Sequence, residues 1–217
     1  MSPAGIPTVA ELWDGGDAAQ WEHALERYWG FLKPANVELE HDMEALTRAS
    51  IEHLDAQAWL EFLELRYFRW KYTAPNRYAT TTAALRRQVD RIGADALLRI
   101  RDRILAGLDG PVDRALTAAC DIGGLGPAGA SGLLALLRPD AFATIDQFVA
   151  KALSEVESLP EHAAVCRMSP EGLTVRDGVV LITIMRRKAA ALNAAFEVDS
   201  WTPRKVDMVL WTYGRPA

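Results

Sequence analysis

A glycine-rich stretch, IGGLGPAGASGLL at Ile122–Leu134, is the part of the chain best suited to bind an anion. Five of its thirteen residues are glycine, an unfavourable composition for a helix, yet the segments on both sides have helical periodicity. Glycines let the backbone approach a ligand closely, and the free amides at the start of a helix favour negative charge. The stretch therefore predicts a phosphate-binding loop, a tight turn between two helices, or both.

A second residue with chemical potential is Asp146, which follows Ala130 by 16 residues and precedes the apolar helical pattern of residues 147–157. A carboxylate in a site can orient or deprotonate water and can stabilise positive charge that develops on a sugar. Asp is also a frequent N-cap residue of helices. Asp146 therefore fits a catalytic role, a capping role, or both.

Several loop types compete for the glycine-rich stretch. A Walker loop requires lysine where Ala130 stands. A dinucleotide fingerprint is present literally at Gly124, Gly126 and Gly129, but helical residues precede it, where that motif requires a strand. A helix-hairpin-helix fits better, because the turn is followed by Pro127 at a first helical position. A plain helical hairpin without a ligand is the structural alternative.

Taken together, the two features resemble the helix-hairpin-helix DNA glycosylase superfamily. Its members carry a hairpin written Leu-Pro-Gly-Val-Gly-x-x-x-Ala, an apolar helix, and a loop that ends in Asp-x-x-Val. Here residues 122–130 occupy the hairpin and residues 142–149 the second motif, and the resemblance covers residues 111–157. It implies that a damaged, mispaired or modified base is flipped out of double-stranded DNA, with Asp146 as the catalytic residue. The DNA contacts that it implies are Gly124, Leu125, Gly126, Ala128 and Gly129.

The chain also departs from the family pattern. Bifunctional members carry a lysine two residues past the last hairpin glycine, where Ala128 stands, so the resemblance implies a monofunctional enzyme without lyase activity. Two cysteines cannot hold an iron–sulfur cluster, and no cofactor is expected to be required. The resemblance implies at most a structural Na⁺ or K⁺ bound by the backbone carbonyls of Cys120, Ile122 and Leu125. A non-catalytic helix-hairpin-helix module that binds DNA or a protein is the alternative function.

Basic and aromatic residues alternate in LRYFRWKYTAPNRY, residues 65–78. This composition is typical of a surface that stacks bases and contacts phosphates, and equally of a buried aromatic helix with snorkelling cations. It supplies the candidates for a base pocket and for DNA contact: Arg69, Trp70, Tyr72, Asn76 and Arg77. Lys71 and Lys151 are the remaining lysines near the motifs, and either could act as an amine nucleophile.

The elements that must position these residues read mostly as helices. Asp17, Asp55 and Thr202 are predicted N-caps, and Asp109-Gly110-Pro111 predicts a helix end followed by a helix start. Residues 172–185 fit either a β-hairpin turning at Asp177-Gly178 or part of a long helix. We favour the helix, because no other segment offers a sheet to join.

The fold class predicted is therefore all-α, a compact glycosylase-like fold of about nine to eleven helices. We expect one unit over residues 1–217, with its best-matched core at residues 111–157 and with the N- and C-terminal helices packed together as a second lobe. No internal repeat interrupts the chain. A monomer is expected.

Charge and hydropathy limit the kinds of partner that the protein can bind. The net charge of −5 argues against tight nucleic-acid binding by the whole surface. Residues 1–64, however, carry −10, whereas residues 66–103 carry +7, so a basic face is possible on an acidic protein. There is no apolar run of transmembrane length, no signal-peptide pattern in residues 1–16, and no disulfide framework. We therefore expect a cytoplasmic protein, associated with the nucleoid in a bacterium, and no membrane partner.

Overall fold

The structure, a computed structural model, describes residues 6–215, and within them all regular secondary structure is helical and no strand occurs. The all-α prediction is thus confirmed. Fourteen α-helical segments exceed the expected nine to eleven, because several of them, such as α4 and α12, are only four or five residues long. Residues 1–5, part of the segment in which no signal peptide is expected, lie outside the described residues.

The helices follow one another closely along the chain. In order they are α1 (Val9–Gly15), α2 (Ala18–Phe31), α3 (Pro34–Glu44), α4 (Arg48–Glu52), α5 (Ala56–Glu61), a π-helical turn η1 (Phe62–Tyr67), α6 (Phe68–Lys71), α7 (Pro75–Ile92), α8 (Ala94–Gly107), α9 (Val112–Cys120), α10 (Pro127–Leu137), α11 (Gln147–Ser154), α12 (His162–Val165), a 3-10 turn η2 (Pro170–Gly172), α13 (Val175–Phe196) and α14 (Pro203–Gly214).

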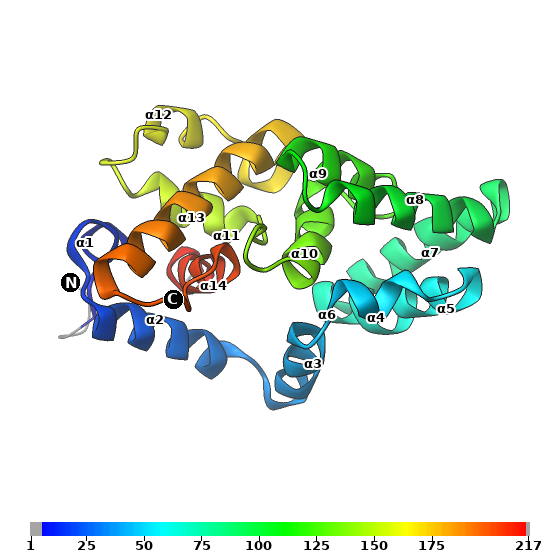
Figure 1. Cartoon of the computed structure of the whole chain (residues 1–217), viewed down its shortest axis with the longest axis horizontal. Helices are drawn as coiled ribbons and strands as arrows, with labels where there is room; N and C mark the ends of the chain where they lie inside the picture. The colour runs from blue at the N-terminus through cyan, green and yellow to red at the C-terminus, as the bar shows by residue number, and fades with distance from the viewer. Residues whose placement is uncertain (1–5, 216–217) are drawn as a thin grey trace.

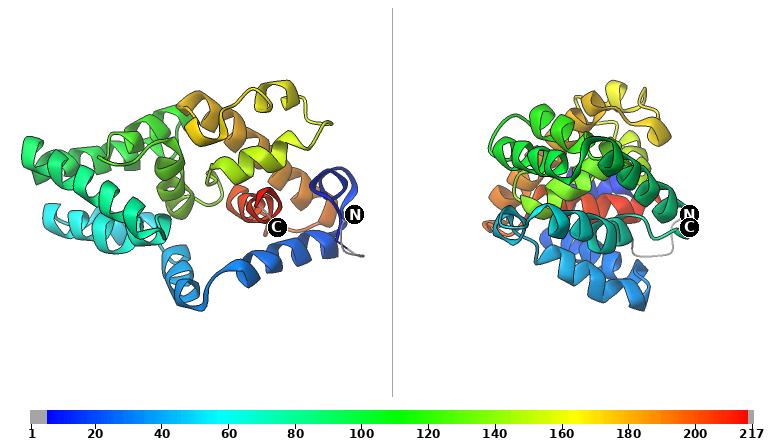
Figure 2. Two further views of the ribbon diagram at one scale, coloured as in Figure 1. Left: turned by 180° about the vertical axis from the view of Figure 1, so that it is seen from behind. Right: turned by 90° about the vertical axis from the view of Figure 1, so that its right-hand side faces the viewer.

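Two lobes lie side by side in Figure 1. One contains α4 to α10, with α8 packed between α9 and the helices α5 and α7. The other contains α1, α2 and α11 to α14, and α14 packs against α2, α11 and α13. The chain crosses between the lobes through α3, which both views of the ribbon place along one side of the molecule (Figures 1 and 2). The N-terminal helix α2 and the C-terminal helix α14 are therefore neighbours in space.

Most helix starts follow the capping signals of the sequence. Asp17, Asp55 and Thr202 each accept a hydrogen bond from the third backbone amide of the helix that they begin. Pro111 stands immediately before α9, and Pro127 and Pro203 occupy first helical positions, where a missing amide hydrogen costs nothing. Short polar side chains thus fix these boundaries locally.

The segment that fits both a hairpin and a helix folds as the helix α13. Thr174 is its N-cap, and Asp177 closes a capping box three residues later. Gly178 is required by packing rather than by a turn, because a Cβ there would lie 2.6 Å from Leu116 and 2.8 Å from Ile145. The Asp-Gly pair that resembles a hairpin turn thus lies where α13 crosses α9.

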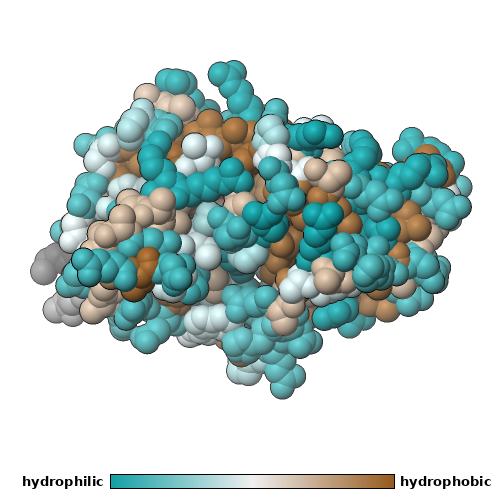
Figure 3. Space-filling view, in the orientation of Figure 1, coloured by the Kyte–Doolittle hydropathy of each residue, from teal (hydrophilic) through white to brown (hydrophobic). Residues whose placement is uncertain are grey.

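The lengths and hydropathy of the described helices can be compared with those of membrane-spanning helices. Within residues 6–215, none combines the length and the apolar character that a bilayer span requires. Figure 3 shows hydrophilic residues spread over most of one face, with hydrophobic residues gathered in patches near its middle.

Candidate functional site

The glycine-rich stretch forms the predicted connection between two helices, α9 and α10. Gly124 adopts a φ of +89°, a left-handed conformation that favours glycine. A Cβ at Gly124 would lie 2.7 Å from the backbone oxygen of Thr81, so α7 lies directly behind the turn. The side chains of Ile122 and Leu125 are buried and anchor the turn in the core. The turn therefore has both conformational and packing reasons for its composition.

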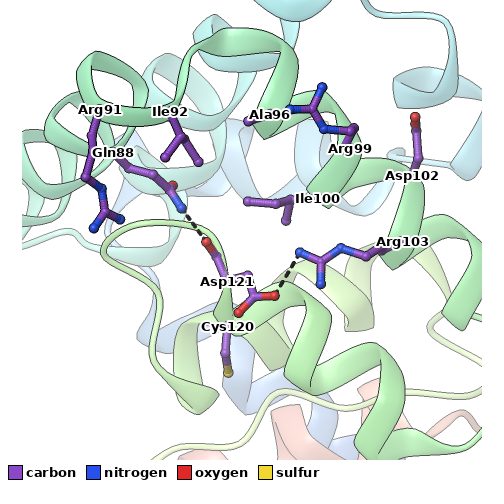
Figure 4. A pocket seen from close by; sticks show the side chains of 10 residues that line it. All are labelled: Gln88, Arg91, Ile92, Ala96, Arg99, Ile100, Asp102, Arg103, Cys120 and Asp121. Carbon is purple, nitrogen blue, oxygen red and sulfur yellow. Dashed lines mark hydrogen bonds and ion pairs between the residues drawn. The ribbon is translucent and has the colours of Figure 1, made fainter.

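Gln88 of α7 clamps this turn from behind. Its side-chain amide donates to the Asp121 carbonyl at 2.6 Å, and its oxygen accepts from the Gly123 amide at 2.6 Å. Figure 4 shows Gln88 and Asp121 meeting in this way, with Arg103 paired to the Asp121 carboxylate. The pocket drawn there, of about 880 Å³, lies on the side of the turn that faces α7 and α8. The hydrogen bonds of Gln88 hold the turn on this side.

The opposite side of the turn presents the start of α10. Gly126 is the N-cap residue, and no side chain caps the helix. The first four amides of a helix lack intrahelical partners, and here Pro127 has none to offer, so the Ala128 and Gly129 amides carry the positive end of the helix dipole. Gly126 and Ala128 both line a cleft between the lobes. This helix start is thus arranged to receive an anion.

Asp146 lies in the same cleft and begins α11. One carboxylate oxygen, Oδ1, accepts hydrogen bonds from the Phe148 amide at 2.9 Å and the Val149 amide at 3.0 Å. No hydrogen bond to the second oxygen occurs within residues 6–215. The predicted cap is therefore confirmed, and it uses only half of the carboxylate.

Buried hydrogen bonds fix the loop that carries Asp146. The Ile145 amide donates to the Ser131 hydroxyl of α10 at 2.9 Å, and the Thr144 amide donates to the Asp207 carboxylate of α14 at 2.6 Å. The side chains of Ser131 and Asp207 are both buried. The loop is thus tied to α10 and α14 directly before Asp146, which sets the position of the carboxylate relative to the start of α10.

The cleft that joins these groups measures about 1020 Å³. It lies between the lobes, and α2, α3, α6, α7, α10, α11 and α14 all contribute to its walls. Aromatic side chains from several helices line it: Tyr28, Trp70, Tyr72, Phe148 and Trp211. Trp211 contacts both Tyr28 and Phe148 edge-on, with ring centroids 5.3 and 6.2 Å apart. A planar group entering the cleft would meet ring faces and edges.

A buried charged network, which we call the Arg204 network, also lines the cleft. Arg204 of α14 pairs with Glu40 of α3 and with Asp207, each at 2.6 Å. The Trp70 indole donates to the other Glu40 oxygen at 2.6 Å. Burial raises the pKa of Asp207 to about 7, against the lowering effects of the Arg204 guanidinium and the Thr144 amide. The Arg204 Nε is buried without a hydrogen-bond partner among the described residues.

Lys71 is a further charged group of the cleft. It ends α6, directly after the π-helical turn, and its side chain is partly buried. Burial lowers the pKa of Lys71, while Asp146 and Asp207 act in the opposite direction. Lys151, the other lysine considered from the sequence, is exposed on α11 and does not line the cleft. Of the two lysines, only Lys71 is therefore placed to meet a ligand in the cleft.

Most of the predicted site residues meet in this one cleft. They are Trp70, Tyr72, Arg77, Gly124, Gly126, Ala128, Gly129 and Asp146. Arg69 and Asn76 are exposed and do not line it, and the Arg69 guanidinium instead lies 5.7 Å from the Tyr78 ring centroid. Leu125 is only 6% exposed, so its side chain belongs to the core rather than to a DNA-contacting surface.

The carbonyl groups suggested for a monovalent ion lie at the end of α9 and in the turn. The Ile122 carbonyl already accepts the Leu125 amide at 3.0 Å, which leaves one of its two lone pairs. The structural ion remains a prediction. Within residues 6–215, no three His, Cys, Asp or Glu side chains gather into a metal-binding group.

Sequence reasoning missed much of the cleft wall. Tyr28, Glu40, Arg204 and Asp207 come from helices outside the recognised motifs, and Phe148, although inside the second motif, was not among the candidates. One signal for them exists, because Arg204 and Asp207 are charged residues at helical spacing in a helix that is otherwise apolar on that side. No local pattern connects them to Glu40, which lies 164 residues earlier in the chain.

In comparisons with known proteins, no protein-family model, curated protein or solved structure matches the chain. The geometry of the cleft therefore carries the functional proposal.

Proposed function

We propose that the protein is a DNA glycosylase, which hydrolyses the N-glycosidic bond of a damaged, mispaired or modified base. One observation carries the proposal: the uncapped start of α10 and the half-free carboxylate of Asp146 open onto the same cleft. Such an enzyme needs a phosphate contact beside a carboxylate that faces the sugar, and a pocket for the flipped base. The similarity of residues 111–157 to the helix-hairpin-helix glycosylases supports the same reaction.

In this proposal the start of α10 binds a backbone phosphate of duplex DNA. The amides of Ala128 and Gly129 donate to phosphate oxygens, and the helix dipole adds attraction. Arg77, exposed at the edge of the cleft, contributes a positive charge. These contacts are independent of sequence and position the duplex rather than select a base.

The target base would leave the stack and enter the cleft. Stacking on side chains such as Trp70, Tyr72 and Trp211 offsets part of the cost of unstacking, because every base has a π-face. The Arg204 network would face the hydrogen-bonding edge of the base. A cleft of about 1020 Å³ accepts a base together with its sugar.

Asp146 would perform the chemistry. Breaking the glycosidic bond develops positive charge on the deoxyribose, which a nearby carboxylate stabilises. The oxygen not used in capping α11 can orient a water molecule and accept its proton. The hairpin offers no amine for a covalent intermediate, because Ala128 stands where bifunctional relatives carry lysine.

The test uses a panel of duplexes with modified or mispaired bases, treated with alkali after incubation with the protein. The proposal predicts strand breaks with wild type and none with Asp146→Asn, while both bind DNA equally. Equal cleavage by the Asp146→Asn variant would remove Asp146 from the mechanism.

The alternative is a helix-hairpin-helix module that binds DNA or a protein without catalysis. The net charge of −5 favours the protein-binding form of this alternative, because an acidic surface is repelled by DNA phosphates. DNA binding without base release from the whole panel would support this alternative.

A further inference from the structure

Lys71 is a nucleophilic side chain that hydrolysis by Asp146 does not use. It lines the cleft with Asp146, and its stem packs on α10, where a Cβ at Gly132 would lie 3.4 Å from the Lys71 Cδ. Its ammonium lies 5.8 Å from the Trp70 ring centroid. Among the described residues, no acceptor lies within hydrogen-bond distance of the Lys71 nitrogen and no carboxylate pairs with it. The amine is therefore held in the cleft without a partner.

The surroundings of Lys71 favour a reactive amine. Burial lowers its pKa, and the positive charge of Arg204 acts in the same direction, whereas Asp146, Asp207 and Glu40 oppose the shift. A lysine that is desolvated in this way holds more neutral amine than an exposed one, and only the neutral form attacks a carbonyl. Lys151 has an exposed side chain outside the cleft and lacks these conditions.

We propose that Lys71 forms a Schiff base with the open-chain aldehyde of an abasic deoxyribose and thereby gives the protein a strand-cleaving lyase activity. The proposal rests on the proposed function only for the source of the abasic site. It locates the amine on α6, which packs against α10, rather than in the hairpin turn itself. Ala128 implies only that the hairpin supplies no amine for a lyase reaction, and it does not exclude an amine from another helix.

The reaction needs no oxidant or reductant. The Lys71 nitrogen adds to the aldehyde carbon C1′, and loss of water gives a protonated imine. A proton then leaves C2′ for the Asp146 carboxylate, and the bond between C3′ and its oxygen breaks, with the phosphorylated strand as leaving group. Water hydrolyses the remaining imine and regenerates the amine.

The test uses a duplex with a preformed abasic site, so that no base has to be removed. Borohydride reduces an imine to a stable amine and links the protein covalently to DNA. The proposal predicts a cross-linked species with wild type and with Lys151→Met, and its loss in Lys71→Met. Met preserves the length and flexibility of the side chain, and an unchanged melting temperature verifies that the variant is folded.

Peptide mapping locates the adduct. A modified lysine resists trypsin, so linkage at Lys71 appears on a peptide of residues 70–77 that contains the missed cleavage. Absence of trapping with wild type, or an adduct only at the N-terminus or at other lysines, would overturn the proposal.

Failure of this inference and failure of the proposed function remain distinguishable. Base release without trapping leaves a hydrolase that acts through Asp146 and rejects the role of Lys71. Trapping on Lys71 without base release from any duplex supports the amine and rejects the glycosylase.

Discussion

At the scale of single residues, the proposal assigns two tasks to the carboxylate of Asp146. Oδ1 caps α11, and the other oxygen has no hydrogen-bond partner among the described residues, at a position that lines the cleft. Asn retains an Oδ1 acceptor and is as good an N-cap as Asp, so Asp146→Asn should change the free energy of unfolding by less than about 0.5 kcal/mol. It should lower the rate of base excision by about 10²–10⁴-fold. Urea unfolding and initial rates of abasic-site formation measure the two effects.

Asp146→Ala provides the comparison, because it removes both functions. It should lose the excision activity and also about 1 kcal/mol of stability through the missing cap. If the Asn variant lost as much stability as the Ala variant, a structural role alone would explain both.

Lys71 should leave a signature in the pH dependence of stability. Its ordinary pKa of 10.5 is lowered in the folded state by burial, so the unfolded state binds more protons in the interval below 10.5. The free energy of unfolding of wild type should therefore rise with pH relative to that of Lys71→Met. Urea unfolding of both proteins at about pH 7 and about pH 10 measures the difference, and an equal gap at the two pH values would contradict the buried environment of the amine.

At the scale of elements, some features around the cleft can be predicted from the sequence, and two others cannot. Glycine and proline positions predict the turn and the start of α10, because backbone conformation at those residues is local chemistry. The clamp by Gln88, 35 residues before Gly123, and the π-helical turn before Lys71 depend on packing between distant segments. Neither has a local signal.

The start of α10 can be tested with Gly126→Asp. A Cβ at Gly126 meets nothing within 4 Å, and an Asp there would cap a helix that now has no side-chain cap. Stability should be unchanged or higher by a few tenths of a kcal/mol, whereas DNA affinity should fall because the carboxylate repels phosphate. Thermal melting and titration of labelled duplex report the two effects. A variant with wild-type affinity would show that the start of α10 is not the phosphate contact.

Gly124→Ala is the matched comparison within the same turn. Its φ of +89° and the 2.7 Å approach to Thr81 leave no room for a methyl group, so this variant should be destabilised by about 1–3 kcal/mol.

At the scale of the whole molecule, the Arg204 network connects helices that lie far apart in the chain. Arg204 joins α14 to α3 through Glu40, and the network continues through Asp207 to the loop that carries Asp146. Removing one partner of a buried ion pair leaves the other charges uncompensated. Arg204→Met should therefore lower the free energy of unfolding by about 3–5 kcal/mol in urea denaturation. A loss below about 1 kcal/mol would mean that the network is not buried in solution.

Because the molecule is acidic overall, the proposed DNA binding would depend on local positive charge at the cleft. Arg77 is exposed at the cleft, so Arg77→Gln should weaken binding to all duplexes alike and reduce the slope of log affinity against log salt by about 1. Arg114→Gln, on the exposed face of α9 and outside the cleft lining, is the control and should leave the slope unchanged. Equal slopes for wild type and Arg77→Gln would place the duplex elsewhere.

The sequence predicted the all-helical class, the turn between α9 and α10 and the capping role of Asp146, since each depends on residues within about one helix and its caps. It did not predict the opposite wall of the cleft. Tyr28 and Glu40 lie on helices that approach Asp146 only after α2 packs on α14, and charged residues such as Arg204 read as solvent-exposed until their buried partners are known. This wall of the cleft therefore forms only through contacts between helices that are far apart in the sequence.

Release of a free base tests the central claim most directly. The protein is incubated with genomic DNA of diverse origin and modification, and the small molecules released are identified by mass spectrometry. The proposal predicts one class of intact base in the wild-type sample, absent from the Asp146→Asn sample although that variant still binds the DNA. Binding by wild type with no base released from any of these DNAs would contradict it.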